Sequence, residues 1–236
     1  MDQGLLIDMS RQALFITLLI VAPVLGAGLL TGLIVAILQA TTQIQEQTLA
    51  FIPKIFAVLI ALGIFGPWML TTLMDFINDY RKLTKLPKPV FKPVEIDNWL
   101  KKNCLLIQNR VEEENINLEV NKNHTNREFI GDEKLLSQVL INLLNNAMDA
   151  LKNRDNKKII LKISDNPEGN LSISVTDNGK GISGEEFDQI FLPFYTTKED
   201  GSGIGLSLSR QIMRMHKGNV NARSVPGKQT TFQLVF

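Results

Sequence analysis

The sequence predicts a two-part chain: an N-terminal transmembrane α-helical hairpin, followed by a soluble domain that contains both helices and strands. Three observations indicate this fold class. Residues 12–45 contain no Asp, Glu, Lys or Arg, residues 55–74 form a second uncharged run, and nearly all remaining charge lies beyond residue 75. Because roughly 20 apolar residues in a helix cross the hydrocarbon core of a bilayer, each uncharged run is long enough for one membrane span.

The two runs and the charge asymmetry give the expected domain boundaries. We expect a membrane hairpin, a helical and Pro-rich linker, and a soluble domain at residues 1–75, 76–95 and 96–236. Within the hairpin, the spans are expected at about residues 13–38 and 53–74. Prolines in the linker favour an extended chain, because a residue that precedes proline is disfavoured in the α region.

The charges that flank the hairpin predict its orientation. Lys54 is the only basic residue between the two spans, whereas five basic residues lie near the ends of the hairpin: Arg11, Arg81, Lys82, Lys85 and Lys88. Since Lys and Arg are enriched on the cytoplasmic side, both termini and the soluble domain are expected in the cytoplasm. A cleaved signal peptide is the alternative, and it is disfavoured because the apolar run is too long and follows Asp2 and Asp8.

Composition argues against two classes of function. Beyond residue 75 the chain has 23 basic and 20 acidic residues, an excess too small to indicate a nucleic-acid partner. Cys104 is the only cysteine, so the chain forms no internal disulfide and the soluble part fits a cytosolic environment.

The hairpin contains a recognisable motif. The segment "QATTQIQEQTLAFIPKI", followed by "GPWML", resembles the FliQ-type small subunit of the export gate in the flagellar and type III secretion apparatus. The likeness covers roughly residues 1–75, and the short apolar tail of that family is missing. It implies a hairpin in the bacterial inner membrane that has no catalysis of its own. Such hairpins pack with other membrane subunits of the export gate, through which unfolded substrates pass.

The soluble part is expected to mix helices with strands. A helix at about Ile96–Glu114 and a strand near "INLEV" come first, and a second helix follows at about Asp132–Lys152. The runs "KKIILKIS" and "NLSISVTDNGKGI" indicate two strands. A glycine-led helix is expected in "GSGIGLSLSRQIMRMH".

The helix over Asp132–Lys152 carries the first polar motif. Its apolar residues recur at helical spacing and predict one buried face: Leu136, Val139, Leu140, Leu143, Ala147 and Met148. Asn142 and Asn146 are four residues apart and therefore share a face, with Asp149 close to the same line. Their amide oxygens suit Mg²⁺, a hard cation that prefers oxygen ligands. Taken alone, two such asparagines are more often ordinary solvated residues.

The second strand ends in an acidic motif. Leu171, Ile173 and Val175 alternate, and Asp177 continues their parity, so its carboxylate is expected on the apolar face. A carboxylate there is costly unless a group hydrogen-bonds to it, and the exocyclic amine of adenine is a suitable donor. Gly179 and Gly181 then give a turn that a flat ligand can approach closely. The alternative is an ordinary Asp-Asn-Gly turn.

Glycines before the last helix form the third motif. Gly201, Gly203 and Gly205 lead into a helix whose N-terminal N–H groups and dipole favour phosphates, and Lys198 adds a positive charge upstream. The spacing G-x-G-x-G, with no strand directly before it, excludes a Rossmann dinucleotide site.

Together, "NLLNNAMDA", "DNGKGI", "FLPFYTTK" and "GSGIGLSLS" resemble the N, G1, F and G2 boxes of the histidine-kinase ATP-binding domain. The likeness covers about residues 76–236 and is strongest to nitrogen-regulator-like sensor kinases. It implies an α/β two-layer sandwich of the Bergerat type that binds ATP and Mg²⁺. It also implies that Asn146 is the Mg²⁺ ligand and that Asn142 lies beside the phosphates. The remaining ATP-binding residues that it implies are Asp177, Gly179, Gly181, Ile182, Phe191, Phe194, Lys198, Gly201, Gly203, Gly205 and Leu206.

The chain lacks an evident phosphoacceptor histidine. His124 and His216 are its only histidines, and neither has an H-E-x-x-x-P-like context. The sequence therefore predicts a membrane-anchored ATP-binding and phosphotransfer module that acts on a histidine-containing dimerisation domain or a response regulator in trans. Two alternatives remain open: an export-gate subunit with an appended ATP-binding domain, and an artefactual fusion of two gene fragments.

Overall fold

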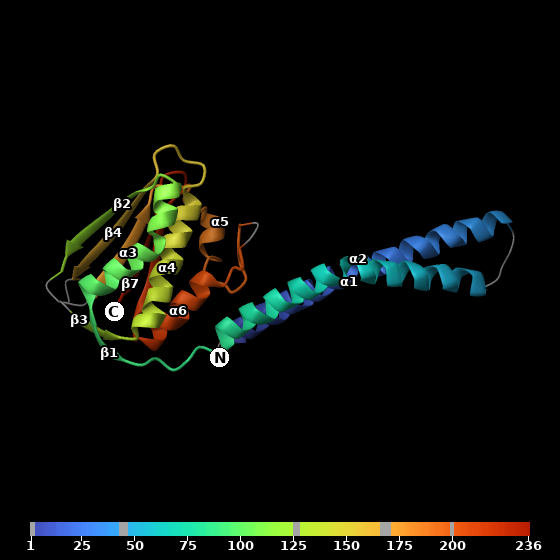
Figure 1. Cartoon of the computed structure of the whole chain (residues 1–236), viewed down its shortest axis with the longest axis horizontal. Coiled ribbons are helices and arrows are strands. Elements are labelled where there is room, and N and C mark those ends of the chain that lie inside the picture. The colour runs from blue at the N-terminus through green and yellow to red at the C-terminus, as the bar shows by residue number, and fades with distance from the viewer. Residues whose placement is uncertain (1–2, 43–46, 125–127, 166–170, 199–200) are drawn as a thin grey trace. The chain divides into compact units, whose positions relative to one another are not determined.

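The computed structural model contains two compact units, Met1–Lys85 and Leu86–Phe236 (Figure 1). The residues described are 3–42, 47–124, 128–165, 171–198 and 201–236.

The first unit is a hairpin of two long helices, α1 (Gln3–Thr42) and α2 (Gln47–Thr84), which pack against each other. Both helices extend beyond the expected spans. The segment between the two expected spans is helical up to Thr42 and again from Gln47 onward, and residues 43–46 lie outside the described part of the chain. α2 continues past the apolar run because "DFINDYRKLT" is compatible with a helix. It ends shortly before Pro87, where the α region becomes unfavourable.

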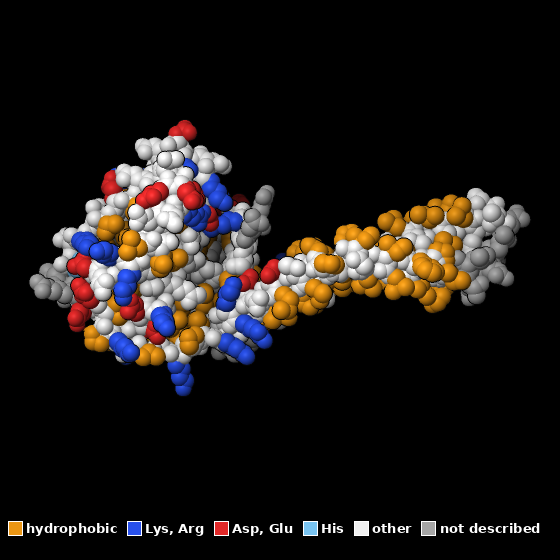
Figure 2. Space-filling view, in the orientation of Figure 1, with side chains coloured by type: hydrophobic (Ala, Val, Ile, Leu, Met, Phe, Trp, Pro, Cys, Tyr) orange, Lys and Arg blue, Asp and Glu red, His pale blue; other side chains and the backbone are white. Residues whose placement is uncertain are grey.

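Two glycines of α1 face α2, and many large apolar side chains of the hairpin are exposed. Gly28 and Gly32 face α2: a side chain added at Gly28 would touch Val58, and one at Gly32 would clash with Lys54. Large apolar side chains such as Leu29 cover the outer surface (Figure 2). Among the described residues, two helices are long and apolar enough to cross a bilayer. Close backbone approach at small residues is a common mode of helix packing in membranes.

The second unit is an α/β two-layer sandwich, as predicted. Its main sheet has the strand order β2-β4-β5-β7-β6, in which β2 and β4 are parallel and the other neighbours are antiparallel. The helices α3, α4 and α6 cover one face of this sheet (Figure 1). A two-stranded sheet of β1 and β3 completes the unit. The elements are β1 (Lys92–Glu95), α3 (Ile96–Glu113), β2 (Asn117–Asn123), β3 (Glu128–Gly131), α4 (Glu133–Ala150), β4 (Lys158–Asp165), β5 (Leu171–Asp177), α5 (Gly184–Phe187), α6 (Gly205–Met215), β6 (Asn219–Val225) and β7 (Gln229–Val235).

Helix α4 lies at the centre of the helical layer and packs against α3, α6 and β5. Its predicted apolar face is confirmed, because all six residues named for it are buried. Asp132 is its N-cap: the carboxylate accepts hydrogen bonds from the backbone N–H groups of Lys134 and Leu135 at 3.0 and 3.1 Å. Capping satisfies amides that have no partner within the helix. The cap thereby fixes where α4 begins, and so which of its residues face away from the sheet.

Candidate functional site

A cavity of about 880 Å³ lies between α4, the end of β5 and the segment that leads into α6. This volume is in the range of small-molecule sites, which are roughly 300–1,000 Å³. Ten of the residues expected at a ligand site line it: Asn142, Asn146, Asp177, Gly181, Ile182, Lys198, Gly201, Gly203, Gly205 and Leu206.

Three other residues that we expected at the ligand are not among the described residues that line this cavity: Gly179, Phe191 and Phe194. Gly179 lies behind Asp177, where its N–H donates to the Asp177 Oδ1 atom at 2.9 Å. The Phe191 ring packs under the Arg210 guanidinium, 3.8 Å from the ring centroid. Phe194 adopts a positive φ of 64°, and its backbone lies against Gly203.

The two asparagines of α4 contact different parts of the α6 region. Asn142 donates from Nδ2 to the Ser209 hydroxyl of α6 at 3.0 Å, and its amide leaves no room for a side chain at Gly205. One turn later, the Asn146 Oδ1 atom accepts a hydrogen bond from Lys198 Nζ at 2.7 Å. The four-residue spacing on one helix face thus brings both amides to the cavity wall, as periodicity predicts.

Asp177 presents a buried carboxylate at the other end of the cavity. Its side chain is the last of the inward-facing series of β5, and only 2% of the residue is exposed. Burial raises the pKa of Asp177 to about 6, and the hydrogen bond from the Gly179 N–H offsets part of that rise. Thr230, which is also buried, lies opposite Asp177 in the register of β5 with β7. A buried carboxylate of this kind suits a ligand that can donate a hydrogen bond to it.

The glycine segment before α6 requires glycine at specific positions. Gly203 has a φ of +68°, a region that L-residues rarely adopt. A side chain at Gly203 would clash with the backbone of Phe194, and one at Gly201 would clash with Thr196. The first backbone N–H groups of α6 have no acceptor within the helix, and the helix dipole favours an anion at this end.

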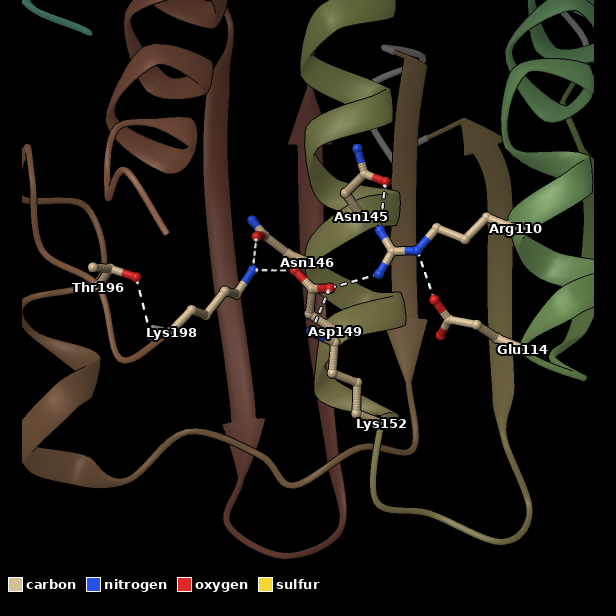
Figure 3. Close-up of polar contacts among 8 residues, drawn as sticks. All are labelled: Arg110, Glu114, Asn145, Asn146, Asp149, Lys152, Thr196 and Lys198. Carbon is tan, nitrogen blue, oxygen red and sulfur yellow. Dashed lines mark hydrogen bonds and ion pairs between the residues drawn. The ribbon is translucent and has the colours of Figure 1, made fainter. Parts of the chain in front are cut away.

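A second group of polar residues, around Asp149, also lies at the cavity wall (Figure 3), although Asp149 and Arg110 were not among the expected ligand-site residues. The Asp149 carboxylate accepts from Arg110 Nη2 of α3 at 2.6 Å and from Lys198 Nζ at 2.7 Å. Burial acts to raise the pKa of Asp149, but the hydrogen bonds from Lys198 and Arg110 outweigh it, so the pKa lies below its ordinary value. The helical spacing placed Asp149 close to the line of the two asparagines, so the sequence indicated its position. No sequence pattern identified Arg110, because it is far from Asp149 in the chain.

The described residues supply some, but not all, of the oxygen ligands that a metal ion requires. In the described part of the chain, no group of three or more His, Cys, Asp or Glu side chains is arranged to hold a metal. On α4, the Asn146 Oδ1 atom lies at the cavity wall, where it accepts from Lys198 Nζ. A single amide ligand of this kind fits Mg²⁺, which takes few protein ligands and completes its shell with water and substrate phosphates.

Comparisons with known protein families divide the chain in the same way. The family described as "Bacterial export proteins, family 3" matches residues 5–78, and the family described as "Histidine kinase-, DNA gyrase B-, and HSP90-like ATPase" matches residues 131–236. The first match continues three residues beyond the boundary of the hairpin that we expected.

Individual relatives agree with this division. Flagellar biosynthetic protein FliQ of Bacillus subtilis (strain 168) is 58% identical over 79 residues, which are 34% of this chain and 89% of FliQ. Sensor histidine kinase ZraS of Escherichia coli (strain K12) is 32% identical over 159 residues, which are 67% of this chain and 33% of ZraS. The chain thus spans about a third of the length of this sensor kinase.

Solved structures of histidine kinases are similar to a large part of the chain. The catalytic domain of histidine kinase ThkA in a nucleotide-free form has a TM-score of 0.54 and 26% identity, covering 62% of this chain and 97% of that one. Full-length ShkA in complex with AMPPNP has a TM-score of 0.61 over 77% of this chain and 37% of that one, and its 22% identity is evidence for the fold alone. Through the similarity of its hairpin to FliQ, the chain therefore belongs to family 3 of the bacterial export proteins, and its residues 131–236 match the histidine kinase-, DNA gyrase B-, and HSP90-like ATPase family.

Proposed function

We propose that the second unit binds Mg-ATP in the cavity between α4 and α6 and transfers phosphate to a histidine supplied by another domain or chain. The observation that supports this proposal is one cavity whose two ends differ in chemistry. A buried hydrogen-bond acceptor, Asp177, lies at one end, and the glycine segment with Asn142, Asn146 and Lys198 lies at the other. A nucleotide has the matching polarity, with a base that donates and phosphates that are anionic.

The adenine is proposed to lie against Asp177, with the exocyclic amine donating to the carboxylate. Ile182 and Leu206 line the same cavity and offer apolar contact to the flat ring. Because Gly179 already donates to Asp177 Oδ1, that carboxylate is held in one orientation before the ligand arrives. Preorganisation of this kind reduces the entropic cost of binding.

The triphosphate is proposed to lie along Gly201, Gly203 and Gly205, with Lys198 and the Asn146 amide beside it. Bound Mg²⁺ would neutralise charge on the phosphates, and Asn146 Oδ1 is the proposed protein ligand to it. The chain's own residues then contribute mainly orientation and preorganised charge, which are the principal sources of catalysis in phosphoryl transfer.

The phosphoacceptor is proposed to come from outside the described part of this chain. His216 is buried, its Nε2 atom accepts from the backbone N–H of Asp132 at 3.0 Å, and its Nδ1 atom lies 2.8 Å from the Ile212 carbonyl. Both ring nitrogens are therefore engaged in structural contacts. His124 lies just beyond β2, away from the residues that line the cavity. A histidine-containing dimerisation domain, with a response regulator downstream, is the corresponding partner.

The hairpin is proposed to anchor this unit in the bacterial inner membrane, with both termini and the ATP-binding unit in the cytoplasm. The outward apolar surface of α1 and α2 and the basic residues near the hairpin ends support this orientation. The 58% identity to FliQ further supports a membrane hairpin.

Asn146→Ala tests the nucleotide site. We expect the full chain in detergent to bind Mg-ATP and the variant to lose measurable binding, because the proposed metal ligand is removed. Isothermal titration calorimetry measures both. The control is Gln138→Ala, which removes an exposed side chain of the same helix and should leave the affinity unchanged. Equal affinity of Asn146→Ala and the wild type would refute the assignment of the site.

A second function is favoured by the similarity to FliQ, of which the chain covers 89%. In this proposal the hairpin is a subunit of a protein export gate and packs with other membrane subunits, and the ATP-binding unit is an appended domain. Gly28 and Gly32 permit α1 and α2 to pack closely, and the exposed apolar side chains of the hairpin are available for contacts with such subunits.

A further inference from the structure

Asp149 is shared by two cations that come from different parts of the fold. Arg110 of α3 donates to its Oδ1 atom at 2.6 Å, and Lys198, from the segment between α5 and α6, donates to its Oδ2 atom at 2.7 Å (Figure 3). We name these three residues the Asp149 bridge. Lys152 is farther away, at 3.8 Å, and its side chain is 67% exposed, so solvent weakens its contribution.

The two cations differ in how firmly they are held. The Arg110 guanidinium also donates from Nε to Glu114 at 2.7 Å and from Nη1 to Asn145 at 3.1 Å, so three groups fix its position. Lys198 contacts Asn146 and Asp149 by its amine alone at the end of a flexible stem, and its side chain is 40% exposed. Arginine suits fixed, forked contacts, and lysine behaves as a mobile point charge.

An unneutralised Asp149 would oppose a nucleotide in this cavity. The residue lines the same wall as Asn146 and Lys198, so its carboxylate would repel phosphate oxygens at short range. If Lys198 were the only cation on Asp149, its transfer to the phosphates would expose that negative charge at the moment of binding. Arg110 removes the conflict, because it remains on Asp149 when Lys198 leaves.

We propose that Arg110 is a positioning residue for the phosphate end of the site. Because Arg110 keeps Asp149 neutralised, Lys198 can leave Asp149 and Asn146 and bind the phosphates of Mg-ATP instead. This inference rests on the proposed function. The same exchange releases Asn146 Oδ1, to which Lys198 Nζ donates in this structure. The Lys198 ammonium and the metal ion therefore cannot contact this oxygen at the same time. Arg110 favours the arrangement with metal bound, because it stays paired with Asp149 after Lys198 has left.

Arg110→Met, assayed in the full chain in detergent, tests the proposal. We expect the affinity for Mg-ATP, measured by isothermal titration calorimetry, to fall by about tenfold, since an unpaired carboxylate then faces the phosphates. The decisive variant is Arg110→Met combined with Asp149→Asn, which removes that carboxylate and should restore most of the affinity. A purely structural role for Arg110 predicts no such rescue.

The matched control is Lys102→Met, which breaks another ion pair between α3 and α4, with Glu133 at 2.9 Å, away from the cavity. This variant should bind Mg-ATP as the wild type does.

If a thermal melt shows that Arg110→Met does not fold, Asp149→Asn alone replaces it as the test. Asp149→Asn should bind Mg-ATP more tightly than the wild type, because the phosphates then no longer compete with the Asp149 carboxylate for Lys198. Unchanged affinity in Arg110→Met, no rescue in the double variant, or unchanged affinity in Asp149→Asn would each overturn the proposal. Absence of Mg-ATP binding by the wild type would instead refute the proposed function.

Discussion

At the scale of single residues, Asp177 shows how folding changes the chemistry of one side chain. The sequence indicated a carboxylate on the apolar side of a strand, and the structure buries it at the cavity wall. Burial removes water that stabilises the charged form, so the pKa of Asp177 rises to about 6 from the ordinary 3.8. The ionised group therefore costs stability that the neutral group does not.

This rise predicts a pH dependence of stability. Because the folded-state pKa lies above the unfolded value, the folded unit binds more protons between the two values, and its free energy of unfolding falls as pH rises through that interval. Between pH 5 and 7, Asp177 should lower the free energy of unfolding by about 1 kcal/mol. Urea unfolding of a fragment 86–236, followed by Trp99 fluorescence, measures this loss. Asp177→Asn should not show it, and identical pH profiles for both proteins would contradict the assignment.

At the scale of elements, Asp132 connects three segments of the second unit. Its carboxylate caps α4 and also accepts from the Val90 N–H at 2.8 Å, while its own N–H donates to His216 at the end of α6. The ring of Phe91 packs edge-on against His216, with centroids 5.2 Å apart. The chain that enters the unit is therefore attached where α4 begins and α6 ends, and these are the helices that frame the cavity.

Asp132→Ala should destabilise the second unit by about 2 kcal/mol, because an N-cap is lost together with a tertiary hydrogen bond. The midpoint of urea unfolding of the same fragment measures the change. Glu133→Ala is the neighbouring control: it removes an exposed ion pair with Lys102 and should change stability by less than about 0.5 kcal/mol. Equal effects of the two substitutions would argue against the capping role.

At the scale of the whole molecule, the chain joins an export-protein hairpin to a kinase-type domain. The family matches end at residue 78 and begin again at residue 131, and α2 continues as one helix to Thr84. Helix therefore follows helix across the end of the first match without a break in the backbone, so the junction is physically reasonable.

The two-part chain predicts one membrane-bound polypeptide. An antibody raised against residues 95–236 should detect, in membranes of the source cells, a band at the mass calculated for this chain. The hairpin should then be tested for complementation of a strain that lacks its own FliQ-type subunit. A larger band alone would mean that the catalytic domain belongs to a longer sensor kinase and that the hairpin is a separate export protein.

Local patterns in the sequence were sufficient for the secondary structure near the site. The helical spacing of apolar residues in α4 and the alternation in β5 depend only on neighbours along the chain, and the structure confirms both. Glycine spacing likewise marked the segment before α6. Periodicity reports which face of an element is buried, so it located Asn142, Asn146 and Asp177 on the faces that the structure shows.

The tertiary structure alone decided which distant residues meet. Arg110 reaches Asp149 across 39 positions, Lys198 reaches Asn146 across 52, and the strand register sets Thr230 opposite Asp177. The parallel pairing of β2 with β4 was equally absent from the sequence pattern. Such contacts depend on the packing of whole elements and on strand register, which neighbouring residues do not encode. The sequence by itself thus determined the two parts of the chain and the motifs of the site, and the fold determined the charges that surround them.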